Sequence, residues 1–220
     1  MITIVGLGPS NRKHTSVGAW ELLLAAPTVF VRTARHPVVD ELREQGVNLI
    51  SFDGLYDTAE SFDEVYQGIA SRLLDAAGRG DVVYAVPGHP LVGERAVGIV
   101  MARAADAGIE VRLVGSESFI EPVLEAVGVG FDIGLKILDA LTISGVRPDT
   151  DVPNLIYQVY DRLIASNVKL ALMDVYPDEF EVTVVTGAGT DNPEVRTLPL
   201  YELDRGGFDH LATVYIPAMT

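Results

Sequence analysis

The sequence of 220 residues contains no cysteine. This absence excludes disulfide bonds, thiolate nucleophiles, cysteine-ligated zinc and iron–sulfur clusters, and it suits a reducing compartment. Hydrophobic residues make up 48% of the chain, which is long enough to bury a sizeable core. We therefore expect a globular cytoplasmic protein whose stability comes from apolar packing.

Long hydrophobic runs are also missing. Charged residues or glycines interrupt every apolar run well before the ~18 residues that a membrane-spanning helix needs. The chain begins directly with a strand pattern, Met1 to Val5, and lacks the basic and apolar regions of a secretory signal peptide. We expect neither a transmembrane helix nor a signal peptide.

Positive charge is scarce, with 16 Lys and Arg against 31 Asp and Glu and a formal net charge of −15. Such a charge repels nucleic acid phosphates and anionic membranes, so we expect neither as a partner. The balance is uneven, because residues 1–39 hold four basic side chains and a single acidic one. A local anion site near the amino end is therefore compatible with the sequence.

The histidines do not predict a metal site. The four histidines are His14, His36, His89 and His210. No two of them have the spacing that places two ligands on one helical face, and zinc-ligating cysteines are absent. We expect no metal.

The first half of the chain alternates between two patterns. Short β-branched or apolar runs at residues 2–7, 28–32, 49–52, 81–86 and 109–114 are typical of buried strands, and the segments between them have helical periodicity. This alternation predicts a mostly parallel sheet covered by helices on both faces.

The second half has a different pattern. Glycine-rich residues 128–134 are typical of a crossover, and residues 161–172 have helical periodicity. The strand-like runs are 155–159, 182–185, 196–200 and 213–216. We predict an α/β protein of two lobes, with an amino-terminal lobe at 1–114, a carboxy-terminal lobe with a mixed sheet at 115–220, and a ligand cleft between them.

One loop is especially informative about ligand binding. The apolar run from Asp81 ends in two prolines, Pro87 and Pro90, that bracket Gly88 and His89. The prolines fix φ and remove two amide donors, while Gly88 allows backbone to approach a ligand closely. Ligands bind at the carboxyl ends of strands in open α/β sheets. The sequence therefore predicts a ligand site at this loop.

The turn after the first strand contains a second glycine pattern, Gly6-x-Gly8. A dinucleotide site would need a third glycine where Asn11 stands and an acidic residue after the second strand, where Arg32 stands. The dinucleotide interpretation is therefore disfavoured. Two interpretations of this segment remain: an ordinary tight turn, and a turn that binds another ligand.

Seven stretches of the chain together resemble one known family. They are Val5–Pro9, Val31–Pro37, Phe52–Tyr56, Tyr84–Pro90, Ser116–Phe119, Lys169–Pro177 and Leu198–Asp204. In this order they resemble the tetrapyrrole methylase family, and in particular the methylase-like amino-terminal domain found fused to MazG-type nucleotide pyrophosphohydrolases. The resemblance covers nearly the whole chain. It implies a two-lobed fold that binds S-adenosylmethionine, or its product S-adenosylhomocysteine, between the lobes, usually as a homodimer.

The resemblance also implies which residues contact this cofactor. By position they are Leu7, Pro9, Pro87, Gly88, His89, Leu91, Val92, Glu117, Ser118, Gln158 and Val159. His89 stands where the family commonly has Asp. The MazG-fused subfamily also has His at this position. Two of these residues have structural alternatives, because His89 could stabilise its own loop and Glu117 could cap a helix start.

Basic side chains follow the first two predicted strands. Arg12 follows the first strand, and Arg32, Arg35 and His36 follow the second. Because parallel strands end at one edge of a sheet, we expect these residues, with Tyr56, to line a substrate site for an anionic acceptor. The alternative is a solvated basic surface.

These patterns together predict a methyltransferase-like domain acting on a small acceptor. Methyl transfer from a sulfonium needs in-line approach and exclusion of water more than a dedicated acid or base, so we assign no catalytic residue. The alternative is a non-catalytic sensor or dimerisation domain that binds the same cofactor within a MazG-type pyrophosphohydrolase. A cavity for an acceptor distinguishes these two functions: an enzyme needs free space facing the methyl group, whereas in a sensor side chains can fill it.

Overall fold

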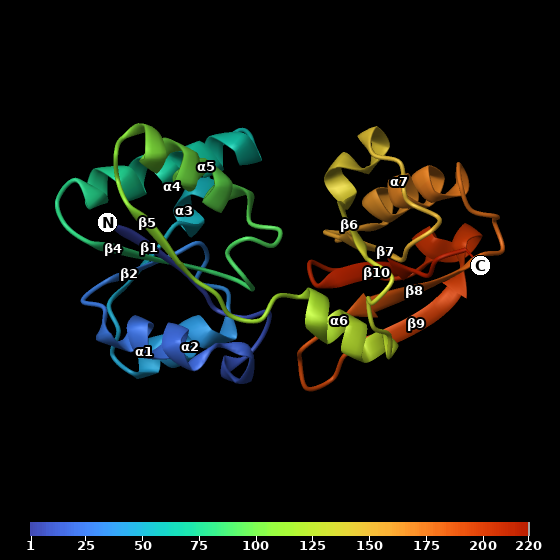
Figure 1. The fold of residues 1–220 in the computed structure, drawn as a ribbon, viewed down its shortest axis with the longest axis horizontal. Helices are drawn as coiled ribbons and strands as arrows, with labels where there is room; N and C mark the ends of the chain where they lie inside the picture. The colour runs from blue at the N-terminus through green and yellow to red at the C-terminus, as the bar shows by residue number, and fades with distance from the viewer. Residues whose placement is uncertain (220) are drawn as a thin grey trace. The chain divides into compact units, whose positions relative to one another are not determined.

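The computed structural model describes residues 1–219, which form two compact units (Figure 1). The first unit is Met1–Phe119 and the second begins at Ile120. The division falls slightly after the predicted boundary at residue 114. The reason is that Gly115 and Ser116 are hydrogen-bonded to Ser16 and Gly6 of the first unit.

The first unit contains a five-stranded sheet in which every pair is parallel, as predicted. The strands are β1 (Ile2–Gly6), β2 (Val29–Val31), β3 (Leu49–Ser51), β4 (Val82–Val86) and β5 (Val111–Val114), in the order β3-β2-β4-β1-β5. The central strands β4 and β1 are fully paired, with Gly6 opposite Val86. The turns after β1 and β4 therefore start side by side at one edge of the sheet.

Helices cover both faces of this sheet (Figure 1). On one face lie α1 (Val17–Ala25) and α2 (Pro37–Glu44), and on the other lie α3 (Asp53–Tyr56), α4 (Phe62–Ala77) and α5 (Arg95–Asp106). The short helix η1 (Arg12–His14) precedes α1. Alternate strand residues serve the two faces, since Tyr84 packs in the core under α4 and α5 and Ala85 packs in the core under α1 and α2.

The second unit contains a mixed sheet, also as predicted. Its strands are β6 (Lys136–Asp139), β7 (Asn154–Tyr157), β8 (Glu181–Thr186), β9 (Glu194–Pro199) and β10 (Ala212–Ile216), in the order β6-β7-β10-β8-β9. Only the β6–β7 pair is parallel among these described strands.

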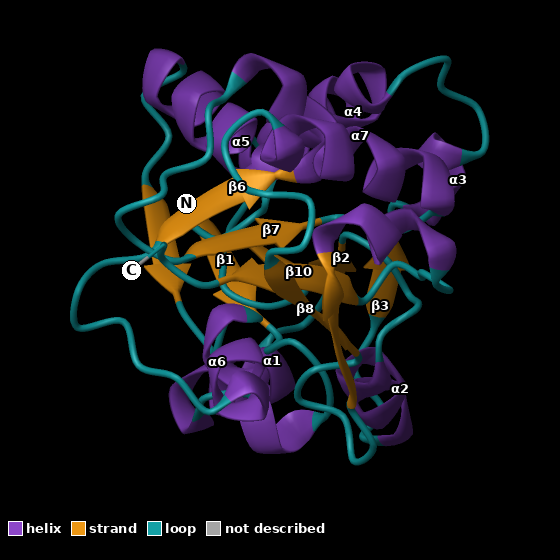
Figure 2. Ribbon diagram, turned by 90° about the vertical axis from the view of Figure 1, so that its right-hand side faces the viewer, coloured by secondary structure: helices purple, strands orange, loops and turns teal. Residues whose placement is uncertain are grey.

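The helical elements of the second unit lie on both sides of its sheet. They are α6 (Ile120–Val127), η2 (Ala140–Gly145), α7 (Arg162–Met173) and η3 (Leu200–Arg205). The core forms where α7, η2 and η3 pack on the sheet, and α6 lies on the opposite side (Figure 2). Within residues 1–219, no helix combines the length and apolar character needed to cross a bilayer.

His36 links the start of α2 to the turn after β1. Its side chain is buried, with Nδ1 accepting a hydrogen bond from the Val38 amide at 3.3 Å and Nε2 donating to the Gly8 carbonyl oxygen at 3.1 Å. Together these bonds require the neutral ring. Burial lowers the pKa of His36 to about 4, and the positive charge of Arg32 acts in the same direction. The structure therefore places His36 in the interior of the unit, where it positions Gly8.

We predict that His36 makes the stability of the first unit depend on acid pH. Because its folded pKa of about 4 lies below the ordinary 6.5, its contribution is complete above about pH 6.5 and is lost as pH falls towards 4. His36→Asn, which can still cap a helix but cannot titrate, should remove this dependence. Relative to this variant, the wild type should lose roughly 3 kcal/mol between about pH 7 and pH 4.

Urea unfolding followed by the fluorescence of Trp20, the one tryptophan of the chain, measures this difference in the first unit. His210→Asn provides a matched substitution at an exposed position. An equal gap between wild type and His36→Asn at both pH values would show that His36 is not held neutral by burial.

Candidate functional site

The turn after β1 and the proline-flanked loop after β4 are joined directly by their backbones. The Gly8 amide donates to the Gly88 carbonyl oxygen at 3.1 Å, and the Gly88 amide donates to the Gly8 carbonyl oxygen at 2.7 Å. Both residues have positive φ, 81° for Gly8 and 63° for Gly88, a conformation that favours glycine. This glycine bridge brings together the cofactor segments predicted around Leu7 and His89.

Gly6 allows the two segments to approach this closely. A Cβ at Gly6 would lie 2.5 Å from the Gly88 carbonyl oxygen and 3.0 Å from the Ser116 amide nitrogen. Real Cβ atoms do not approach backbone at the first of these distances, so any side chain would force the strand end and the loop apart. The glycine is thus required by packing at the end of β1.

Residues 115–118 form the third segment of the site within this unit. Ser116 Oγ donates to the Gly6 carbonyl oxygen at 2.7 Å and accepts from the Ser16 amide at 3.0 Å. Ser16 Oγ in turn donates to the Gly115 carbonyl oxygen at 2.7 Å. The contact of Ser16 with residues 115 and 116 was not predictable, because a serine before a helix is typical of an N-cap. Ser16 is indeed also the N-cap of α1.

Glu117 is held against η1. Its amide donates to the His14 carbonyl oxygen at 3.2 Å, and its carboxylate is paired with His14 Nδ1. Glu117 thus joins this third segment to η1, and α6 begins three residues later at Ile120. The neighbouring Ser118 is buried.

His89 is fixed by its own loop. Its Nδ1 accepts a hydrogen bond from the Leu91 amide at 3.1 Å, and its ring lies so close to Gly115 that a Cβ there would overlap Nε2. These contacts agree with the alternative in which His89 stabilises its own loop. The ring lies between this loop and residues 115–118. Leu91 itself is 61% exposed, and Val92 is half-buried.

The remaining predicted cofactor residues, Gln158 and Val159, follow β7 in the second unit. Gln158 is the one non-glycine residue with positive φ within residues 1–219, at 64°. Its amide, oriented to donate, lies 2.9 Å from Asp139 Oδ1, and Val159 is fully buried in the core of its unit. Strained backbone of this kind concentrates at functional sites, which makes Gln158 a notable position.

The predicted substrate residues do not gather in one place. The guanidinium of Arg12 lies over the Trp20 ring of α1 at 4.7 Å, and Arg35 is exposed. Arg32 and Tyr56 instead lie on the face covered by α3, α4 and α5, where Arg32 is paired with Glu94. The sheet therefore separates Arg12 from Arg32, which sequence reasoning could not foresee because both simply follow strands.

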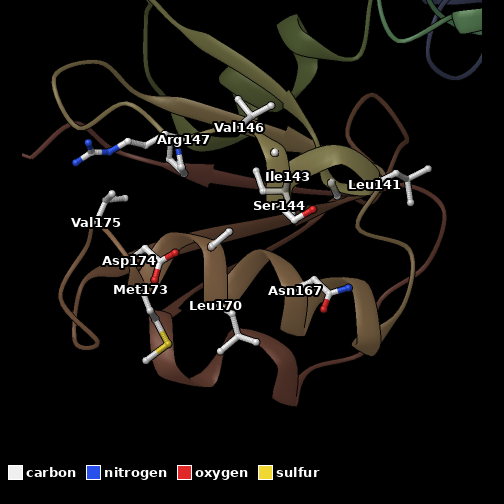
Figure 3. A pocket seen from close by; sticks show the side chains of 14 residues that line it. Leu141, Ile143, Ser144, Val146, Arg147, Asn167, Leu170, Met173, Asp174 and Val175 are labelled. Carbon is white, nitrogen blue, oxygen red and sulfur yellow. The ribbon is translucent and has the colours of Figure 1, made fainter.

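The second unit contains a hollow of about 1050 Å³ between η2 and α7 (Figure 3). Apolar side chains such as Ile143, Val146 and Leu170 line it, with Arg147 and Asp174 among its polar residues. None of the predicted cofactor or substrate residues lines this hollow. In the part of the chain that the structure describes, no three His, Asp or Glu side chains are grouped as a metal site would require.

The sequence matches the family described as Tetrapyrrole (Corrin/Porphyrin) Methylases over residues 1–204. A curated relative, the "Uncharacterized protein YabN" of Bacillus subtilis (strain 168), is 41% identical over 217 residues. The match covers 98% of this chain but only 44% of the relative, so this chain spans less than half of that protein.

Two solved structures share the fold. The uroporphyrin-III-C-methyltransferase of Thermus thermophilus superposes with a TM-score of 0.76 at 19% identity, covering 98% of this chain and 91% of that one. A diphthine synthase superposes with a TM-score of 0.73 at 20% identity, covering 100% and 90% of the two chains. With the family match over residues 1–204 and the glycine bridge at the end of β1, this chain belongs to the tetrapyrrole methylase family.

Proposed function

We propose that this protein binds S-adenosylmethionine and transfers its methyl group to a small acceptor. The glycine bridge between Gly8 and Gly88 is the observation that carries the proposal, because it joins two glycine-containing turns at the carboxyl edge of a parallel sheet, where ligands bind. Membership of the tetrapyrrole methylase family supports the same cofactor.

The residues of the first unit fit the cofactor in a specific way. Gly6 and Gly8 pack against the backbone of Gly88 and His14, whereas a Cβ at Gly88 would meet no atom within 4 Å, so the backbone there is open to a ligand. Leu7, Pro9, Gly88 and His89 would hold the amino acid end of the cofactor, with Glu117 and Ser118 beside them. For Gln158 and Val159 of the second unit, a cofactor role stays a prediction from the family resemblance.

The bound sulfonium supplies an electrophilic methyl group. The protein's own part is to hold the acceptor in line with it and to exclude water. The bond between Ser116 Oγ and the Gly6 carbonyl oxygen and the packing of His89 on Gly115 keep the turn in one conformation. A rigid turn helps to hold the methyl donor and the acceptor in line, which this reaction needs more than an acid or a base.

A second candidate function is a non-catalytic sensor or dimerisation domain for S-adenosylmethionine or S-adenosylhomocysteine. The chain spans 44% of YabN, which favours a role as one part of a longer protein, and a MazG-type pyrophosphohydrolase is the partner that the family resemblance implies. The homodimer and the cytoplasmic location likewise stay predictions.

We predict that the protein binds S-adenosylhomocysteine at one site per chain. Isothermal titration should give a micromolar dissociation constant, and the amide resonances of Gly8, Gly88 and Ser116 should shift on titration. A screen of cell extract with radiolabelled S-adenosylmethionine then separates the two functions. A labelled product supports the enzyme, binding without product supports the sensor, and absence of binding contradicts both.

We predict that Gly6→Ala weakens S-adenosylhomocysteine binding at least tenfold, an effect of about 1.4 kcal/mol or more. The new Cβ would push Gly88 away and open the glycine bridge. The same change should lower the free energy of unfolding by roughly 2 kcal/mol through overpacking against backbone.

Gly18→Ala is the matched control. A Cβ at Gly18, in α1, would meet no atom within 4 Å, so the change should leave binding intact and favour the helix slightly. Equal affinities of the two variants would show that the close approach at Gly6 does not shape the cofactor site.

A further inference from the structure

Four side chains meet on the face of the first unit that α3, α4 and α5 cover, and we call them the Arg32–Glu94 cluster. Arg32 follows β2, Tyr56 ends α3, Tyr84 lies in β4, and Glu94 directly precedes α5. Phe30 pairs with Tyr84 across β2 and β4, so Arg32, two residues after Phe30, points to the same face as Tyr84. The cluster therefore forms at the carboxyl ends of β2 and β4.

The cluster contains a buried ion pair. Arg32 Nε lies 3.4 Å from Glu94 Oε1, and the Glu94 side chain is only 7% exposed. Although Glu94 occupies the N-cap position of α5, its side chain makes no cap hydrogen bond to the helix. Burial raises the pKa of Glu94 to about 7, an effect that the charge of Arg32 partly offsets. A pair of this kind contributes little to stability, because both ions lose their hydration.

Hydrogen-bond donors around the pair lack partners. Among the described residues, the hydroxyls of Tyr56 and Tyr84 and Arg32 Nε are buried without a hydrogen bond. Tyr84 is fully buried, so its hydroxyl has no access to bulk solvent. Native proteins rarely leave buried donors unsatisfied, and the exceptions call for a functional explanation. The two hydroxyls have no acceptor, and Arg32 Nε has the ion pair with Glu94 in place of a hydrogen bond, so the cluster can serve a further acceptor group.

The exposure of the side chains in the cluster increases from the core to the surface. Tyr84 is 0% exposed, the Glu94 side chain 7%, and the Arg32 side chain 28%. A group approaching from outside therefore meets Arg32 before Glu94. The proline-flanked loop containing Gly88 and His89 lies between β4 and Glu94 in the chain, so the cluster adjoins the proposed cofactor turn.

We propose that the Arg32–Glu94 cluster binds a single oxyanion, a carboxylate or phosphate of the methyl acceptor, which replaces Glu94 as the partner of Arg32. The assignment of this oxyanion to the acceptor rests on the proposed function. Arg32 and the two tyrosine hydroxyls donate to its oxygens, which gives the hydroxyls an acceptor and Arg32 a new anionic partner. Glu94 then takes up a proton, since a buried carboxylate without a partner is strongly disfavoured.

The cluster selects for one anionic group. Arg32 is its only cation, whereas Arg12 lies against Trp20 and Arg35 is exposed on the surface. Arg95, which follows Glu94 in the chain, is already paired with Asp63, and an acceptor with many carboxylates would meet a protein of net charge −15. The site therefore favours a small acceptor with a single carboxylate or phosphate.

Binding should depend on the protonation of Glu94. The titratable and charged groups around Glu94 are Arg32, Tyr56, Tyr66 and Tyr84, with Arg95 next in the chain paired to Asp63 at 3.8 Å. Burial raises the pKa of all three tyrosines above its ordinary value, so none of them titrates near neutrality. If the oxyanion binds only when Glu94 is protonated, affinity falls about tenfold from about pH 6 to about pH 8.

Sulfate and acetate are suitable probes, because neither changes charge between these pH values. NMR titration that follows the Nε–H resonance of Arg32 gives the dissociation constant of each. For the wild type we expect the binding to be about tenfold weaker at about pH 8 than at about pH 6. Tighter binding of sulfate indicates a phosphate, and tighter binding of acetate indicates a carboxylate.

Three variants test the roles of the residues, with backbone amide shifts as the readout. Glu94→Gln, which resembles the protonated acid, should bind the probes at about pH 8 as tightly as the wild type does at about pH 6. Arg32→Gln should weaken binding more than tenfold. Arg35→Gln, an exposed arginine on the same segment, is the matched control and should bind like the wild type.

Three results would overturn the proposal: no shift of Arg32 with either probe, unchanged pH dependence in Glu94→Gln, or equal losses in Arg32→Gln and Arg35→Gln. Titration of the same variants with S-adenosylhomocysteine separates this proposal from the proposed function. Probe binding without S-adenosylhomocysteine binding would retain the oxyanion site and reject the methyltransferase assignment. Circular dichroism verifies that each variant is folded.

Discussion

The glycine bridge between Gly8 and Gly88 is the interaction on which the site in the first unit depends. It consists of two backbone hydrogen bonds, and the Gly8 carbonyl oxygen also accepts a bond from His36 Nε2. Ser116 Oγ fixes the adjacent Gly6 carbonyl oxygen. Three segments far apart in the sequence are thereby fixed around one turn. This arrangement explains why glycine is needed at positions 6 and 8.

The sheet of the first unit divides the polar side chains near this turn into two groups with different tasks. On the face of α1 and α2, a neutral His36 serves as a structural connector and Arg12 packs on Trp20. On the face of α3, α4 and α5, Arg32 and Glu94 form a buried ion pair beside two tyrosine hydroxyls that lack hydrogen bonds. The first group connects helices to the turn, and the second contains buried hydroxyls without partners that a ligand can use.

Much of the architecture was predictable, because β-branched runs and Pro-Gly punctuation report directly on buried parallel strands and on the loop at Gly88. The partners of individual side chains were not predictable. A histidine before Pro37 gives no sign that it will be buried as a helix cap, and Glu94 before a helix is typical of a cap that the structure does not show. Strand β6 was missed because the glycine-rich segment before it suggested a crossover. Each of these features depends on residues distant in sequence.

Amide hydrogen exchange at Gly8 and Gly88 tests the central claim most directly. If the bridge holds the site together, both amides should exchange as slowly as those of β1 and β4, and S-adenosylhomocysteine should slow them further. Exchange as fast as in an exposed loop, unchanged by S-adenosylhomocysteine, would contradict the account.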